Sequence, residues 1–380
     1  MAEGDIGAVI DSLTFDGVAA SRCRIIHVAG AVFAIAYAGP DADGFLCTVT
    51  IGDDGAISDA VIDTLEFDGA QGVAPSIIHV AGAVFAIAYN GPDTDGWVCT
   101  VSINADGTID DAVIDTLEYD AYQALEPKII HLGGQAYAVA DRGNNYAEII
   151  YSFTITDAGL ISDAILDTLI VKAPTVYEGH LIQVNNSVCA IVLQDSDLDG
   201  WLITVPCNSQ GAIGDAIIAS LEFAPVQAYT PFIIHISGNV FAIVGSTYNG
   251  AGTIYTVTIY PAGTLDAAVI DSYAFTSAQK QGINFMHISG TVYALVYSDT
   301  GNDLWVKTLS IGIDGTITEA IIDSLELDEA DGLNPGLIHV TGNIYAVAYT
   351  GTTSVGKLKT FDIDTVPAGF QKHLMLMGID

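Results

Sequence analysis

Short apolar segments bounded by turn residues recur along the whole chain in a fixed order. In the stretch 76–120 they read SIIHVAG (76–82), AVFAIAY (83–89), GWVCTVSI (96–103) and AVIDTLEY (112–119). Each is rich in Val, Ile, Thr or aromatic residues, and Gly, Asn or Asp residues lie between them, which is typical of β-strands. No stretch shows the spacing of a helix. The pattern therefore predicts units of four antiparallel strands.

The four-strand unit returns every 52 residues, seven times in all. The segment IIHVAGAVFAIAY at 25–37 recurs at 77–89, and weaker copies begin at 129, 181, 233, 285 and 337. Fixed periods of this length are typical of propellers and solenoids, in which each unit buries its faces against its neighbours. The second strand places Ala34 beside large residues such as Phe33, so that neighbouring sheets can nest closely. Both faces of each sheet are therefore expected to be covered.

These features predict an all-β, seven-bladed β-propeller with four antiparallel strands per blade. A β-solenoid is the alternative, although solenoid coils are usually shorter. The fourth-strand motif already appears at 9–16 (VIDSLTFD), before any first strand, and the last copy, 337–363, supplies only three strands. We therefore expect the N-terminal strand (9–16) to complete the last blade and close the ring.

The chain resembles repeat β-propellers as a superfold over essentially its whole length. It lacks the Trp-Asp ending of WD repeats and the Gly-Gly pairs of kelch repeats, and a superfold implies no specific function. A single domain over 1–380 is expected, with a C-terminal tail at 364–380, because the segment 373–380 matches the strand motif poorly. The blades are predicted at about 25–68, 77–120, 129–172, 181–224, 233–276, 285–328 and 337–363 plus 9–16.

Charge narrows the class of partner. The net charge is -36, from 46 acidic against 10 basic residues. Such a surface repels the phosphates of nucleic acids and of anionic membranes, and no apolar run reaches the roughly 18 residues of a membrane helix. We expect a monomer that binds no nucleic acid and inserts into no membrane. No leader peptide is visible, so a cytoplasmic location is the default, and an extracellular or surface location would follow if a leader has been removed.

Two polar series repeat with the blades. A histidine occupies one position of the first strand in six copies, and Gln183 replaces it in the fourth: His27, His79, His131, His235, His287 and His339. An aspartate occupies one position of the fourth strand, and Ala219 replaces it in the same blade: Asp11, Asp63, Asp115, Asp167, Asp271 and Asp323. This shared loss favours a buried structural network, similar to that of WD-repeat propellers. A histidine ring that holds a metal or performs catalysis is the alternative.

Loops between the second and third strands, and between the fourth strand and the next blade, vary most and share one predicted face. Variable loops on a rigid scaffold form the expected binding surface. The candidate ligand contacts on this face are Trp97, Trp201, Trp305, Tyr122, Tyr146, Tyr177, Tyr229 and Arg142. Aromatic rings beside polar groups suit sugar rings, and Arg142, one of three arginines, is suited to a uronate. The alternative for the tryptophans is a place in the core.

The loop QDSDLDG at 194–200 places Asp195, Asp197 and Asp199 before a glycine, like the first half of an EF-hand calcium loop. Ile203 and Pro206 stand at the ninth and twelfth positions of that loop, where oxygen ligands are usual, so an Asp-rich turn is the alternative. No cofactor besides calcium is indicated.

No nucleophile motif, phosphate loop or zinc spacing is present. We therefore expect a non-catalytic binding or scaffold propeller for a carbohydrate or a protein. One alternative is a polysaccharide-active enzyme, a lyase or glycosidase, with Asp141, Arg142 and Tyr146 as candidates at the channel mouth. Another is a cell-surface or virion structural unit. The sequence leaves catalysis open.

Overall fold

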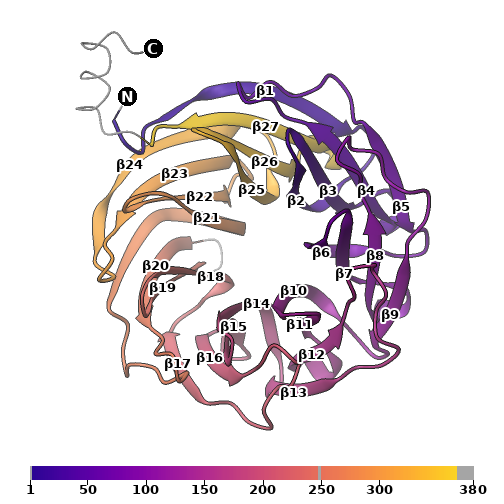
Figure 1. Cartoon of the computed structure of the whole chain (residues 1–380). Coiled ribbons are helices and arrows are strands. Elements are labelled where there is room, and N and C mark those ends of the chain that lie inside the picture. Colours follow the sequence, from indigo (N-terminus) through magenta and orange to yellow (C-terminus); the bar gives the residue numbers. More distant parts are fainter. Residues whose placement is uncertain (1, 247–249, 366–380) are drawn as a thin grey trace.

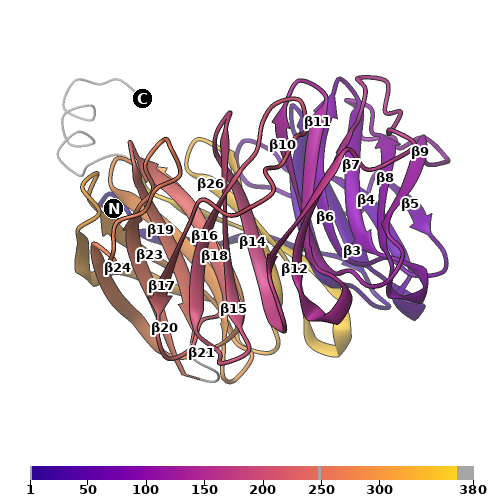
Figure 2. The same ribbon diagram turned by 90° about the horizontal axis from the view of Figure 1, so that it is seen from below.

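Four-stranded antiparallel units stand around a common axis and confirm the predicted all-β, seven-bladed propeller (Figure 1). The computed structural model describes residues 2–246 and 250–365, without the side chains of 178 and 278–281. The first strand of each blade lies nearest the axis and the fourth lies at the rim (Figure 1). In side view the blades stand next to one another and their loops project from two faces (Figure 2).

The strands of the first four blades follow the chain in order. Blades 1 and 2 contain β2 (Ser21–Ala29), β3 (Val32–Ala38), β4 (Gly44–Thr50) and β5 (Asp63–Asp68), then β6 (Val73–Ala81), β7 (Val84–Asn90), β8 (Gly96–Ser102) and β9 (Asp115–Asp120). Blade 3 contains β10 (Leu125–Gly133), β11 (Ala136–Arg142), β12 (Glu148–Thr154) and β13 (Asp167–Lys172). Blade 4 contains β14 (Val176–Asn185), β15 (Val188–Asp195), β16 (Gly200–Pro206) and β17 (Ala219–Ala224). Short 3-10 turns occur in the loops between second and third strands: η1 (Pro40–Ala42), η2 (Pro92–Thr94), η3 (Asn144–Tyr146) and η4 (Thr352–Ser354).

Blades 5 and 6 share one long strand. Their strands are β18 (Tyr229–Ser237), β19 (Val240–Ser246), β20 (Gly250–Thr258), β21 (Asp271–Ser289), β22 (Val292–Asp299), β23 (Leu304–Ile311) and β24 (Ile317–Asp328). The first part of β21 pairs with β20 and the second part pairs with β22. This strand therefore leaves the rim of blade 5 and becomes the innermost strand of blade 6.

The last blade is completed by the N-terminal strand, as the phase of the repeat predicts. Blade 7 contains β25 (Leu333–Thr341), β26 (Ile344–Thr350), β27 (Gly356–Ile363) and β1 (Ile6–Asp16), in the order β1-β27-β26-β25. The predicted tail 364–380 lies outside the described residues beyond Thr365.

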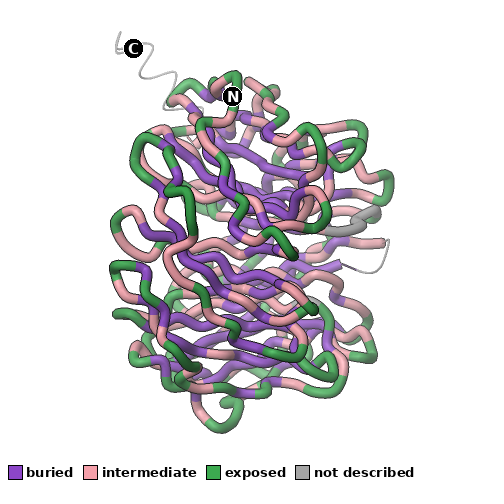
Figure 3. Tube along the Cα trace, turned by 90° about the vertical axis from the view of Figure 1, so that its right-hand side faces the viewer, coloured by how far each residue is buried: buried purple, intermediate pink, exposed green. Residues whose placement is uncertain are grey.

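Apolar side chains fill the spaces between blades rather than one central core. Phe33 and Ile35 of β3 pack against Ala346 and Ala348 of β26, so the large residues of one blade meet the small residues of its neighbour. The same pattern recurs at the other boundaries, and buried segments alternate with exposed loops around the molecule (Figure 3). At about 25 cal/mol per Å² of buried apolar surface, these interfaces supply most of the favourable free energy of folding.

A buried hydroxyl on each third strand clamps the blade to its neighbour. It donates a hydrogen bond of 2.5 to 2.6 Å to the backbone carbonyl of a glycine. At six boundaries this glycine lies in the turn between the third and fourth strands of the next blade. The donors are Thr48, Thr100, Ser152, Thr204, Thr256, Thr308 and Thr360. An acceptor such as Gly107 has φ of +91°, a left-handed conformation that glycine adopts without a side-chain clash. For Thr308 the acceptor is Gly4, ahead of the closing strand β1.

The aspartate series forms a second clamp at the rim. One oxygen of each aspartate accepts a backbone N–H of the next blade at 2.8 Å; for example, Asp63 Oδ2 accepts from Ile109 and Asp115 Oδ2 from Ile161. At the closure, Asp323 of blade 6 accepts the N–H of Ile6 in β1, because the fourth strand of blade 7 comes from the N-terminus and is not joined to β27 by a turn. The aspartates therefore join neighbouring blades.

Two further features complete the fold. Cys189 and Cys207 form a disulfide, whereas Cys23, Cys47 and Cys99 are buried thiols. Within the described ranges, no helix is long and apolar enough to cross a membrane.

The rim clamp predicts a measurable loss of stability. Asp115→Ala should lower the free energy of unfolding by about 1–3 kcal/mol, because the Ile161 N–H loses its partner at a blade interface. Chemical denaturation followed by circular dichroism measures the change. The exposed neighbour Asp111 provides the control, since Asp111→Ala should change the free energy by less than about 0.5 kcal/mol. Equal effects of the two substitutions would contradict the clamp.

Candidate functional site

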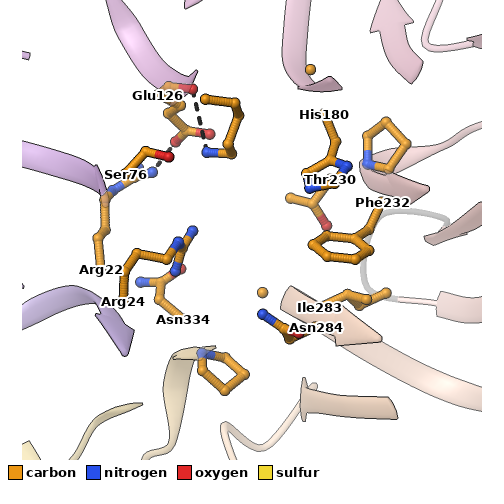
Figure 4. A pocket seen from close by; sticks show the side chains of 15 residues that line it. Arg22, Arg24, Ser76, Glu126, His180, Thr230, Phe232, Ile283, Asn284 and Asn334 are labelled. Atoms are coloured by element: carbon orange, nitrogen blue, oxygen red, sulfur yellow. Dashed lines mark hydrogen bonds and ion pairs between the residues drawn. The ribbon is translucent and has the colours of Figure 1, made fainter. Parts of the chain in front are cut away.

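A cavity of about 310 Å³ lies at one mouth of the central channel. The first residues of the innermost strands form its wall, and this mouth belongs to the loop face, which we define as the face bearing the loops that lead into the innermost strands. Figure 4 shows Arg22, Arg24 and Asn334 on one side of the opening and His180 and Phe232 on the other.

The wall of the cavity is where the repeat diverges. Blades 1 and 2 are identical over 25–37 and 77–89. The residue immediately before these segments nevertheless differs, since it is Arg24 in blade 1 and Ser76 in blade 2. Across the seven blades this position carries seven different residues: Arg24, Ser76, Lys128, His180, Phe232, Asn284 and Gly336. Positions whose side chains hold the blades together keep the same residue type in most copies. The divergence at this position therefore indicates a role other than holding the ring together.

The backbone at the mouth is held in an uncommon conformation. Two positions before the divergent one, Arg22, Glu126, Thr230 and Asn334 have φ between 46° and 65°. The pairing of each inner strand with its neighbour is irregular at the same place, for example between Ser21 and Arg24. Left-handed non-glycine residues cost on the order of 1 kcal/mol or more each, and such strain and such bulges concentrate at functional sites.

Positive charge gathers in this cavity although the chain is strongly acidic. Arg22, Arg24 and Lys128 line it, and Glu126 is the one acidic residue among the described lining residues. Arg22 forms an ion pair with Glu126. The Arg24 guanidinium donates to the carbonyl of Cys23 at 2.9 Å, and Lys128 Nζ donates to the carbonyl of Glu126 at 3.3 Å. Three positive charges against one negative charge make the cavity suitable for an anion.

His180 contributes a neutral ring to the opposite wall. It stacks on Phe232 with ring centroids 3.9 Å apart, and its Nδ1 accepts the backbone N–H of Ile233 at 3.4 Å. Burial, followed by the charges of Lys128 and Arg24, lowers the pKa of His180 to about 3. The proton of the neutral ring therefore belongs on Nε2, which leaves a hydrogen-bond donor.

Blade 3 departs from the repeat through charged residues behind the cavity wall. Asp141 and Glu148 are each 1% exposed, and none of their carboxylate oxygens has a hydrogen-bond partner among the described residues. Burial raises the pKa of Asp141 well above its usual range, against a smaller lowering by the nearby Tyr119 hydroxyl. Burial likewise raises the pKa of Glu148 to about 8, although Lys128 and Arg142 act in the opposite direction.

The side chain of Glu148 fits in blade 3 because the neighbouring aromatic residue of other blades is replaced there by a smaller one. The equivalent residue is glycine in blades such as blade 2, where a Cβ on Gly96 would meet the Tyr119 ring at 2.5 Å. In blade 3, the smaller Val171 replaces that aromatic residue. The Glu148 carboxylate lies instead beside Gly179, where a Cβ would meet Oε1 at 2.4 Å. Four of the other blades have proline at the position of Gly179, namely Pro75, Pro127, Pro231 and Pro335.

The structure brings together three of the predicted ligand contacts. The Arg142 guanidinium lies 5.6 Å from the centre of the Tyr146 ring and 5.7 Å from that of Tyr177. Tyr146 is 48% exposed and Tyr177 37% exposed. Tyr122 is more exposed, at 74%, in the loop that leads into blade 3. Tyr229 begins β18 at the repeat position of Tyr177 and is partly buried. We call Arg142 and Tyr146 of blade 3, together with Tyr177 of blade 4, the Arg142 platform.

The predicted tryptophans lie between blades rather than on an open surface. Trp97, Trp201 and Trp305 are partly buried and pack against the interblade apolar clusters. Lys172 Nζ lies 3.8 Å from the centre of the Trp201 ring and also pairs with Asp195 at 3.2 Å. These contacts favour the core alternative for the tryptophans.

The acidic loop of blade 4 is folded on itself. Asp195 Oδ1 accepts the backbone N–H groups of Asp197 and Asp199, at 3.1 and 3.2 Å, and its other oxygen pairs with Lys172. Among the described residues, no group of three His, Cys, Asp or Glu side chains has the geometry to hold a metal ion. Calcium binding by Asp195, Asp197 and Asp199 stays a prediction.

The expected buried histidine–aspartate network is wrong. Each histidine of the series is exposed and its Nε2 hydrogen-bonds the carbonyl of the hairpin glycine three residues later, as His27 does with Gly30 at 2.9 Å. Asp11 belongs to the same blade as His339, since strand 9–16 completes the last blade, but its carboxylate accepts the N–H of Ile57 in blade 1. The hairpin is too near the end of the blade for burial, so the two series serve different contacts.

Sequence reasoning did not find the channel cluster. Arg22, Arg24 and Lys128 fall in different blades, and the signal that could have found them is the divergence of one position within otherwise regular copies. Asp141 was a candidate for catalysis, but its carboxylate is enclosed. Glu148 could have been found as the one acidic residue at a position that is glycine in five blades.

The buried acid gives a pH-dependent prediction for stability. The ordinary pKa of a glutamate is 4.5 and that of folded Glu148 is about 8, so the folded state retains a proton that the unfolded state releases between these values. Wild-type stability therefore loses a contribution as the pH rises from 4.5 to about 8. Glu148→Gln removes this loss and should gain about 1–3 kcal/mol over the wild type at the upper end of the window. Denaturation of both proteins across the window measures the difference, and a constant difference would contradict the buried, protonated acid.

No protein-family model matches the chain, and no curated protein sequence matches it. Solved structures share its architecture. A proposed 6-phosphogluconolactonase from Bacteroides uniformis has a TM-score of 0.57 and 14% identity, over 80% of this chain and 85% of that one. Sqt1 from Chaetomium thermophilum has a TM-score of 0.57 and 11% identity, over 94% of this chain and 100% of that one. Likeness at these identities shows the propeller fold alone.

Proposed function

We propose that this protein is a non-catalytic binding propeller that takes an acidic carbohydrate at the channel mouth on its loop face. The observation that carries the proposal is the gathering of Arg22, Arg24 and Lys128 around one cavity of about 310 Å³ in a chain of net charge -36. A positive cavity in a negative surface focuses the electrostatic field and attracts an anion specifically to that mouth.

Arginine is suited to a carboxylate because its planar guanidinium can donate two parallel hydrogen bonds. The ion pair of Arg22 with Glu126 holds one guanidinium at the wall, and the Cys23 carbonyl holds that of Arg24. Positioned groups lose less conformational entropy on binding. The cavity therefore has two fixed guanidinium groups and the ammonium of Lys128 for a carboxylate or sulfate.

The remaining lining suits the body of a sugar. Asn284 and Asn334 offer amide donors and acceptors, and Phe232 and His180 offer ring surfaces. Beyond the cavity, the Arg142 platform presents a further cation beside two partly exposed tyrosine rings. Apolar ring faces with a few fixed polar groups are usual in sites for small polar ligands.

The alternative of a polysaccharide-active enzyme has less support. Lyases and glycosidases need acid or base groups within hydrogen-bond reach of the substrate. The unpartnered acids nearest the mouth, Asp141 and Glu148, have enclosed oxygens, and His180 is held neutral by its low pKa. A protein ligand or a structural role in an assembly has no specific contact in its favour.

Calorimetric titration with trigalacturonate and with neutral galactotriose tests the proposal. The acidic sugar should bind and the neutral sugar should bind at least about tenfold more weakly, since charge-assisted hydrogen bonds contribute about 1.5–3 kcal/mol each. Added salt should weaken the acidic sugar further.

Arg24→Gln should lower the affinity for trigalacturonate by about tenfold or more, and Arg142→Gln should lower it less. Lys307→Gln is the matched control, because Lys307 lies over the Tyr297 ring in blade 6 rather than in the lining of the cavity. Thermal melting of each variant confirms folding. Equal affinity for both sugars, or full affinity in Arg24→Gln, would overturn the proposal.

A further inference from the structure

Glu148 lies directly behind the wall of the channel cavity. Gly179 lines the cavity, and the direction in which its side chain would point leads to the Glu148 carboxylate, with 2.4 Å between the position of a Cβ and Oε1. Only the backbone of one strand therefore separates the carboxylate from the space in which a ligand would lie. A proline at position 179, as in four other blades, would occupy this space.

The charged groups described around Glu148 come from the strands β10, β11, β13 and β14. Lys128 and Glu126 lie on β10, and on β11 Arg142 stands opposite Glu148 in the strand register. Asp141, also on β11, is near enough for the charge of Glu148 to raise its pKa further. Lys172 of β13 lies opposite Glu148 in the sheet, but its ammonium is paired with Asp195. His180 on β14 is neutral through its low pKa. Lys128 is thus shared, since it faces both the cavity and the buried acid.

We propose that Glu148 makes anion binding at the channel mouth proton-linked, so that the bound state holds Glu148 protonated. A bound anion offsets the positive potential that Lys128 creates at the Glu148 carboxylate. It also adds its own negative charge, with only one strand between it and that carboxylate. Both effects disfavour ionised Glu148, because like charges in a poorly solvated region repel strongly. The balance is protein with ionised Glu148, plus anionic ligand, plus one proton from solvent, giving the complex with neutral Glu148. This inference rests on the proposed function.

The pH dependence follows from the direction of the shift. Glu148 of the free protein changes ionisation near its pKa of about 8, and the ligand raises that pKa. Below this range the acid is already neutral and the affinity is constant. Through this range and above it, binding takes up a proton and the affinity falls as the pH rises. The carboxylates of a galacturonate probe are fully ionised throughout, so they contribute no proton.

Calorimetry with trigalacturonate at about pH 7 and about pH 9, in buffers of different ionisation enthalpy, measures both affinity and proton uptake. The wild type should bind about three- to tenfold more weakly at the higher pH and take up a fraction of a proton near pH 8. Glu148→Gln should bind equally at both and take up none. Asp141→Asn is the matched control, since Asp141 is an equally enclosed acid of the same blade whose pKa responds chiefly to burial and Tyr119 and less to Asp120 and Glu148, and it should keep the linkage.

A second readout follows the acid itself. Carbon-13 NMR of the Glu148 carboxyl, assigned with Glu148→Gln, should show its pKa rising on addition of trigalacturonate and rising in free Lys128→Met. Glu148→Gly, which restores the residue of five other blades, serves if the glutamine variant melts early. Binding without proton uptake, or a linkage that survives in Glu148→Gln, overturns this inference alone. Absence of binding at both pH values overturns the proposed function and the linkage with it.

Discussion

The fold depends on two hydrogen bonds between neighbouring blades, one from a third-strand hydroxyl at all seven boundaries and one to a fourth-strand aspartate at six of them. The third-strand hydroxyl reaches a glycine carbonyl 59 residues later, and the fourth-strand aspartate reaches a backbone N–H 46 residues later. Each separation is constant at five boundaries, where the partner follows later in the chain and lies in or just after the turn between the third and fourth strands of the next blade, so one inserted residue within a blade would displace both partners. This explains why a period of 52 residues is kept without slippage while many side chains vary. The same two bonds recur at the closure, where Gly4 and Ile6 supply the carbonyl and the N–H.

A scaffold held in this way leaves particular positions free to differ. The residues that face the channel mouth take no part in the clamps between blades, so their identities can diverge without loss of the ring. A left-handed backbone at the start of the inner strands of blades 1 and 3 orients the side chains of Arg22 and Glu126, and the packing of the blades sustains the cost of that conformation. Asymmetric chemistry therefore arises from a nearly symmetric framework by substitutions at one ring of sites, with blade 3 adding a second layer behind it.

The sequence predicts the fold well because the information is repeated. Strand order, ring closure by 9–16 and the nesting of Ala34 and Phe33 follow from periodicity, and each copy tests the others. The site is harder to predict, because it depends on which side chains of different blades converge. Arg142, Tyr146 and Tyr177 were expected on one face, and they meet. The predicted contact between the histidines and the aspartates is wrong. Both residues are replaced in blade 4, but a shared replacement does not require that the two side chains touch. The pairing of Glu148 with Gly179 involves two blades and cannot be read from spacing alone.

One joint of the ring differs from the rest. Ala219 replaces the rim aspartate at the boundary between blades 4 and 5, so this boundary keeps the Thr204 hydroxyl bond but has a methyl group where the other boundaries have a carboxylate. A boundary with one hydrogen bond fewer than the others is expected to open locally at a lower cost in free energy. His180 and Phe232 flank the same boundary at the channel mouth, one on each side. The channel cavity thus opens beside the boundary that lacks the rim carboxylate, and a ligand that contacts both rings would join blades 4 and 5 at that boundary.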